Sequence, residues 1–176
     1  MRIVAKAFFA GFLILTMLSV GSEGWTQSKS DAKAPVITNS YAASKGRYGT
    51  VWRIYVEAKD TDPEMSQIAV VVDQPGYGRY PTDFILLDPQ YRNQFKGFLQ
   101  WNTFSSKGAV LKEGVEITLR ISVIERGGAQ SKEVVFPFTF ISGVREQEEV
   151  PTTFDEGNVP RLGYISIDLV SPQDRF

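Results

Sequence analysis

The sequence predicts an all-β fold in which about seven short strands form a two-layer sandwich. Between residues 35 and 143, apolar and polar side chains alternate with the period of two that half-buried strands require. Clusters of Gly, Pro, Asp and Ser separate the alternating stretches, as turns between short strands would. This region has no stretch with the 3.6-residue period of an amphipathic helix. Alternating faces of this kind build two sheets around one core.

Two stretches give the strongest strand signal. Residues 115–123 alternate without interruption. In residues 51–58, Trp52 and Ile54 share the face that we assign to the core, whereas Tyr55 lies on the opposite face. The predicted strands cover residues 36–41, 51–58, 68–72, 84–87, 95–101, 115–123 and 134–141.

The last two of these strands have distinctive features. Residues 126–129, with the sequence RGGA, predict a hairpin turn between them. Pro137 lies inside the final strand and cannot donate to a hydrogen-bond ladder. We therefore expect the final strand to lie at a sheet edge or to be broken near Pro137.

Residues 51–76, VWRIYVEAKDTDPEMSQIAVVVDQPG, resemble part of the bacterial immunoglobulin-like and fibronectin-type-III-like domains. In those domains a strand ends in an acidic D-x-D turn and the next strand is apolar. Residues 117–140, ITLRISVIERGGAQSKEVVFPFTF, resemble their closing hairpin. The resemblance covers residues 35–143 and implies an immunoglobulin-like β-sandwich with a role in adhesion, spacing or assembly. The disulfide of antibody domains is not matched because the chain has no Cys.

Composition excludes several classes of function. The net charge is -1 and Lys and Arg are not clustered, which argues against a nucleic-acid partner. The chain has no His and no Cys, so the commonest acid–base group, the usual zinc ligands and thiolate nucleophiles are missing. No motif pairs a nucleophile with a base. We therefore expect a protein that is not an enzyme and has no cofactor.

The N-terminus has the pattern of an export signal. Arg2 and Lys6 precede an uncharged apolar run at residues 7–20, and small residues follow it. Residues 1–22 are therefore predicted to be a signal peptide, and residues 23–34 a polar linker. The run is shorter than the ~20 residues of a membrane span, although an uncleaved anchor is the alternative. We expect a periplasmic, outer-surface or extracellular protein without a stable membrane span after cleavage.

Two turns are candidate sites. Asp60, Asp62 and Glu64 follow the first long strand, and their carboxylates could converge on a calcium ion. The alternative is a solvated turn in which Asp occupies favoured positions. Later, Tyr77, Arg79 and Tyr80 lie in a loop of the kind that contacts proteins or carbohydrates. Its alternative is a strand connection whose tyrosines fold back onto the sandwich.

The C-terminal part is predicted to be a mobile acidic connector at residues 144–160, followed by a strand and tail at 161–176. Ile165, Ile167 and Leu169 share one face of that strand. A lone strand is not stable in water. It is therefore expected either to pair with its own sandwich or to dock onto the sheet of another subunit.

Taken together, these patterns predict an exported, non-catalytic binding or assembly module of the bacterial cell envelope. It would act through protein–protein contacts, with another envelope protein as its partner. The alternatives are a carbohydrate-binding module that uses the loop tyrosines, a calcium-binding adhesion-type domain, or a small hydrolase that uses carboxylates.

Overall fold

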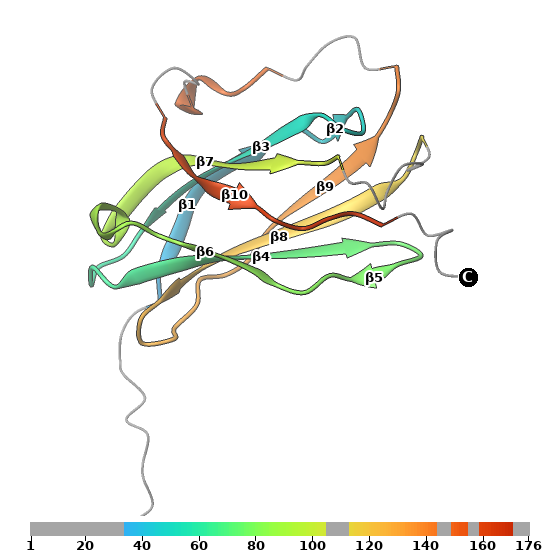
Figure 1. Cartoon of the computed structure of the whole chain (residues 1–176). Helices are drawn as coiled ribbons and strands as arrows, with labels where there is room; N and C mark the ends of the chain where they lie inside the picture. The colour runs from blue at the N-terminus through green and yellow to red at the C-terminus, as the bar shows by residue number, and fades with distance from the viewer. Residues whose placement is uncertain (1–33, 105–112, 144–148, 155–158, 171–176) are drawn as a thin grey trace, which may run out of the picture.

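The computed structural model describes residues 34–104, 113–143, 149–154 and 159–170, which form two β-sheets packed face to face (Figure 1). The predicted signal peptide, all but the last residue of the linker and the end of the tail lie outside these residues. The first sheet has the order β1 (Val36–Ala42), β3 (Val51–Lys59), β7 (Gln94–Asn102) and β10 (Arg161–Ile165). The second has the order β2 (Lys45–Gly46), β9 (Val134–Phe140), β8 (Glu116–Glu125), β4 (Met65–Gln74) and β5 (Gly78–Arg79), and β6 (Asp83–Leu86) also pairs with β4.

The all-β prediction is confirmed, and each of the seven predicted strands is present as β1, β3, β4, β6, β7, β8 or β9. Two short 3-10 helices, η1 (Pro89–Tyr91) and η3 (Thr152–Phe154), occur in the connections. In the part of the chain that the structure describes, no helix is long and apolar enough to cross a membrane.

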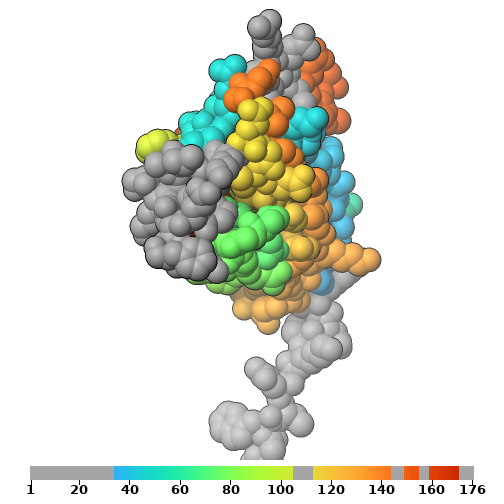
Figure 2. All heavy atoms as spheres, turned by 90° about the vertical axis from the view of Figure 1, so that its right-hand side faces the viewer, coloured from blue at the N-terminus to red at the C-terminus, as the bar shows by residue number. Residues whose placement is uncertain are grey.

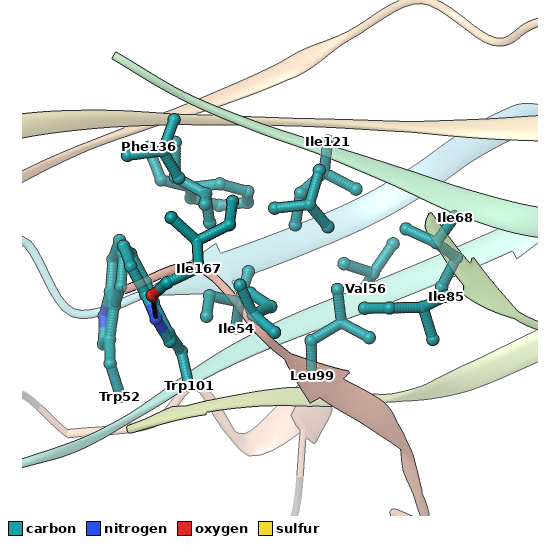
Figure 3. Close-up of a cluster of buried hydrophobic side chains, with 14 of the residues drawn as sticks. Trp52, Ile54, Val56, Ile68, Ile85, Leu99, Trp101, Ile121, Phe136 and Ile167 are labelled. Atoms are coloured by element: carbon teal, nitrogen blue, oxygen red, sulfur yellow. Dashed lines mark hydrogen bonds between the residues drawn. The ribbon is translucent and has the colours of Figure 1, made fainter. Parts of the chain in front are cut away.

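The core lies between the two sheets (Figure 3). Ile54 and Leu99 face it from the first sheet, and Ile68 and Ile121 face it from the second; all four are fully buried. The alternation along the strands predicts that one shared set of side chains forms the core, and all of them are buried: Ile54, Val56, Ile117, Leu119, Ile121, Phe136 and Phe138. The alternation of apolar and polar residues along β3 and β8 therefore predicts correctly which side chains enter the core.

Both strand tryptophans belong to this core. The rings of Trp52 and Trp101 lie on paired positions of β3 and β7, with their centroids 6.0 Å apart. The indole Nε1 of Trp52 donates a hydrogen bond to the carbonyl oxygen of Ala43 at 3.0 Å. Ala43 lies where the chain crosses from β1 in the first sheet to β2 in the second. Trp52 therefore fixes that crossing as well as filling the core.

Pro137 lies on a part of β9 that is open on one side, which agrees with the predicted edge position, although the two-residue strand β2 is outermost in the sheet. On one side β9 pairs with β8 along its length, and Pro137 is the partner of Thr118. On the other side β2 pairs only with Thr139 and Phe140. The missing N–H of Pro137 therefore interrupts no ladder on the open side of β9.

The outer face of the first sheet differs from the expectation. Tyr55 lies on the face opposite the core, as predicted, but it is only 1% exposed. It is covered by Phe154, also 1% exposed, whose ring centroid lies 5.4 Å from that of Tyr55. The hydroxyl of Tyr41 donates to the carbonyl oxygen of Glu149 at 3.0 Å. Residues 149–154 of the predicted mobile connector are therefore held on this sheet by an aromatic anchor.

The C-terminal strand pairs with its own sandwich. β10 runs parallel to β7, and the chain continues to Val170 along the opening between the two sheets (Figure 1). Ile165, Ile167 and Leu169 enter the core and are 5%, 8% and 1% exposed. The interpretation of these three side chains as a docking strand for another subunit is thus corrected. Their apolar face is already buried within this chain.

Side-chain hydrogen bonds replace the β-ladder after Ile165. Trp101 Nε1 donates to the carbonyl oxygen of Ile167 at 2.9 Å, as Figure 3 shows. The backbone N–H of Ser166 donates to Asp83 Oδ2 at 2.7 Å. The predicted alternation up to residue 170 therefore assigns the buried side chains correctly, but only its first half, Arg161–Ile165, is a paired strand. The second half satisfies backbone groups through side chains of the sandwich.

Candidate functional site

The predicted binding loop divides into parts with different roles. Gly78, with φ +108°, adopts a backbone conformation that favours glycine and lets the chain reverse between β4 and β5. Figure 2 shows this turn in green beside the start of β8 in yellow. Tyr80 follows it but is only 4% exposed. Its hydroxyl donates to Gln74 Oε1 at 2.5 Å and accepts from the backbone N–H of Val170 at 2.9 Å. Tyr80 is therefore a core anchor and not a free binding residue.

Tyr77 stacks on Tyr80, with ring centroids 4.3 Å apart and an interplanar angle of 19°. Together with Asp83, residues 166–168 and Val170, the two rings line an open groove of about 350 Å³. Asp83 is engaged by Ser166, and Tyr80 by Gln74 and Val170. The tyrosines fold back onto the sandwich, so the carbohydrate alternative rests on Tyr77 and this groove.

Arg79 belongs to a charged cluster on the outer face of the second sheet. Its Nε and Nη2 atoms bind Asp73 Oδ1 and Oδ2 at 2.9 and 3.2 Å. Arg120 Nε also binds Asp73 Oδ2, at 3.0 Å. The hydrogen bond from Arg79, followed by that from Arg120, holds the pKa of Asp73 below its ordinary value, and partial burial opposes this. The main contact of Arg79 is therefore its ion pair with Asp73, although its side chain remains 63% exposed.

The acidic turn does not form the predicted calcium triad. Asp60 is buried, and its Oδ1 accepts the backbone N–H of Asp62 at 3.1 Å, which is the hydrogen bond of an Asx turn. Asp62 and Glu64 are exposed. Among the residues that the structure describes, no three acidic side chains are placed to hold a metal ion. The solvated-turn alternative therefore accounts for Asp62 and Glu64, but it does not account for the burial of Asp60.

A second buried acid, Glu125, lies close enough to interact electrostatically with Asp60, and it is not among the site residues predicted from the sequence. Glu125 ends β8 at a core-facing position, in register with Ile121 and Val123, and is 3% exposed. Burial raises the pKa of Glu125, and the Asp60 carboxylate raises it further. The nearby backbone N–H of Ala129 lowers the pKa of Glu125 and so offsets part of this rise, although it does not form a hydrogen bond with the carboxylate. An acid at a core-facing position of an alternating strand was the signal that could have revealed it.

Asp60 and Glu125 share an unusual feature. Within the described part of the chain, Asp60 Oδ2 and both carboxylate oxygens of Glu125 are buried without a hydrogen-bond partner. Buried polar atoms in proteins are nearly always hydrogen-bonded. Three such oxygens at one end of the sandwich therefore form a polar cluster that the described residues do not satisfy.

An exposed apolar surface occupies the outer face of the second sheet. Leu86 and Phe84 on β6 are 77% and 52% exposed, and Val135 on β9 is 49% exposed. The register places Phe84 beside Ala69 and Leu86 beside Gln67 on β4. The sequence signal was residues 84–87, FILL, where both faces of one short strand are apolar. We call Leu86 and Phe84 the exposed apolar face; Val135 lies on the same side of the sheet but is separated from them by β4 and β8 and is paired with Arg120.

Comparisons with known proteins identify no family for this chain. No protein-family model matches the chain, and no curated protein shows significant similarity to it. The PKD domain of an M14-like peptidase from a Thermoplasmatales archaeon is 14% identical, with a TM-score of 0.41 over 63% of this chain and 99% of that domain. The CARDB domain of a Pyrococcus furiosus protein, solved in complex with di-metal ions, is 11% identical, with a TM-score of 0.33 over 61% of this chain and 86% of that one. The two-layer β-sandwich of this chain rests on its own strand order and buried core, and the predicted all-β sandwich is confirmed by these.

Proposed function

We propose that this protein is an exported, non-catalytic binding module of the bacterial cell envelope that acts through protein–protein contacts. The exposed apolar face is the observation that carries the proposal. Soluble proteins rarely leave contiguous apolar surface uncovered unless it serves an interaction. Leu86 and Phe84 are neighbours on one face of β6, so their exposed surfaces are adjacent and not scattered.

The surroundings of the exposed apolar face are those of an interface. Ala69 and Val71 on β4 and Ile124 on β8 lie on the same outer face, buried or half-buried between β6 and β9. The cluster of Asp73, Arg79 and Arg120 lies on this face too. An aliphatic and aromatic centre with a charged margin is the usual composition of a protein-binding surface.

The two outer faces of the sandwich contrast with each other. On the first sheet, Tyr55 is covered by Phe154 from the chain itself. On the second sheet, the described residues leave Leu86 more than three-quarters exposed. A partner that presents apolar side chains to the second sheet would bury Leu86 and Phe84 as Phe154 buries Tyr55. The export part of the proposal rests on the pattern of residues 1–22.

The test is capture of a partner by the chain without its predicted signal peptide. Immobilised protein is incubated with envelope extract, and bound proteins are identified by mass spectrometry. The double variant Phe84→Glu, Leu86→Glu is expected to lose the captured partner because it places charge at the centre of the interface. Both side chains are exposed, so its free energy of unfolding is expected to change by about 0.5 kcal/mol or less at each site.

Val51→Glu is the matched control. Val51 is a 48% exposed apolar residue on the first sheet, so this variant adds the same charge away from the exposed apolar face. It should retain the partner. Capture that survives the double variant, or is lost equally in the control, would contradict the proposed surface.

A further inference from the structure

We propose that a calcium ion binds between the carboxylates of Asp60 and Glu125, at the end of the sandwich where β3 and β8 end. This site differs from the predicted triad because its second carboxylate comes from the other sheet. Glu125 points to the core side of the second sheet, whereas the exposed apolar face lies on its outer side, so the ion site does not depend on the protein-binding proposal.

The backbone brings the two acids together. Asp60 follows β3 in the first sheet, and its N–H donates to the carbonyl oxygen of Asn93 at 2.8 Å. Glu125 is the last residue of β8 in the second sheet. The N–H of Arg126 donates to the carbonyl oxygen of Glu64 at 2.9 Å, which ties the acidic turn to the end of β8. The two acidic side chains are thus fixed at one end of the molecule by separate sheets.

The position of Glu125 is set by a tight hairpin. The N–H of Gly128 donates to the carbonyl oxygen of Glu125 at 3.0 Å, and Gly128 has φ +87°. A Cβ at Gly127 would lie 3.3 Å from Glu125 Oε1. The glycines therefore let the turn close over the carboxylate, which leaves Glu125 3% exposed at the rim of the core.

Three oxygens in this cluster are buried and carry no hydrogen bond from the described residues. Asp60 is 7% and Glu125 3% exposed, yet Asp60 Oδ2 and both Glu125 oxygens lack a hydrogen-bond partner among the described residues. Burying a carboxylate without compensation is strongly unfavourable. A single proton would neutralise one of the two acids and leave the other buried and charged. A divalent ion compensates both charges at once.

The donor set favours calcium. Calcium takes six to eight oxygen ligands and accepts irregular geometry, with carboxylates bound through one or two oxygens. Asp60 and Glu125 supply three free oxygens, and turn carbonyls and water can complete the shell. The exposed acids Asp62 and Glu64 add negative potential, since both raise the pKa of Glu125. With two buried carboxylates, we expect a dissociation constant of about 0.1–1 mM, in the range of extracellular modules.

The experiment measures thermal unfolding of the chain without its predicted signal peptide, first in EDTA and then across a calcium titration at constant ionic strength. The melting temperature is expected to rise with calcium concentration because the ion binds only the folded state. Glu125→Gln and Asp60→Asn should each abolish the rise. Glu116→Gln, at the exposed start of β8, should leave it intact. Magnesium at the same concentrations should give a smaller rise because it requires a stricter geometry.

Two results would overturn the proposal. One is a parent protein whose melting temperature is the same in EDTA and in about 10 mM calcium, well above the expected dissociation constant. The other is an equal calcium response in the parent and in both variants, which would indicate surface binding. Calorimetric titration of the parent with calcium alone provides a readout that does not depend on whether a variant folds. Loss of partner capture with an intact calcium response would affect only the protein-binding proposal.

Discussion

Asp73 lies between two guanidinium groups on the outer face of the second sheet, and its lowered pKa predicts that stability depends on pH. The bonds from Arg79 and Arg120 favour its charged form. The pKa of Asp73 in the folded protein is therefore lower than its ordinary value of 3.8. A depressed folded pKa stabilises the protein above the unfolded pKa, and this contribution is lost as the pH falls through the folded pKa.

Asp73→Asn removes this contribution. We expect the variant to lose about 0.5–1 kcal/mol of unfolding free energy at neutral pH, since the cluster is partly exposed. The difference from the parent should shrink below pH 3.8 and vanish in stronger acid, where the parent carboxylate is also protonated. Urea denaturation at a series of pH values measures it. A difference that is independent of pH would show that packing, and not charge, is the role of Asp73.

The register of β8 is the property on which the core depends at the level of elements. Leu119 is fully buried and pairs with Val72, whereas its neighbour Arg120 faces outward and binds Asp73. Leu119→Ala is expected to reduce the free energy of unfolding by about 2–5 kcal/mol, because it removes buried methyl groups and leaves a cavity.

Arg120→Ala, one position along the same strand, is the matched comparison. It should cost well under the loss from Leu119→Ala, since it removes only one partly exposed ion pair. Both are measured by chemical denaturation of the same preparation. Equal losses would mean that the strand is shifted by one residue, which would exchange its two faces.

How far the elements could be predicted depends on how local their signals are. Parity and turn chemistry act within a few residues, so the strands and the core face of β3 and β8 are correctly predicted. The burial of Tyr55 depends on Phe154, ninety-nine positions along the chain, and no local pattern indicates such a contact. Tyr80 is similar, since Val170 is needed to complete its hydrogen bonds. At the candidate site, Asp60 was predicted from its acidic turn, whereas Glu125 carried a local signal, an acid at a core-facing position of β8, but nothing local indicated that it would lie near Asp60.

Two glycines show how the whole molecule accommodates its C-terminal segment. A Cβ on Gly97 would lie 2.5 Å from the carbonyl oxygen of Pro160, and a Cβ on Gly163 would overlap the side chain of Ile85. Without side chains at these positions, β10 can lie directly on β7 and beside β6. The open side of the sandwich is thereby closed by the end of the chain.

The closure predicts that residues 161–176 are required for stability and not only for binding. Deleting them would expose the core beside Leu99 and leave Trp101 Nε1 without its acceptor, Ile167. We expect a large drop in melting temperature or loss of cooperative unfolding, because the missing side chains contribute an appreciable part of a total stability of about 5–15 kcal/mol.

Leu169→Ala and Gly97→Ala provide graded versions of the deletion that are expected to remain folded. Leu169 is 1% exposed, so its truncation should cost about 2–5 kcal/mol of unfolding free energy. Gly97→Ala should weaken the packing of β10 against β7. Its new Cβ would meet the backbone of Pro160, which cannot rotate away as a side chain could. Differential scanning calorimetry of the three proteins beside the parent measures the effect. An unchanged melting temperature in the deletion, accompanied by loss of a partner or an oligomer, would instead show that this strand leaves its own sandwich to pair with another subunit.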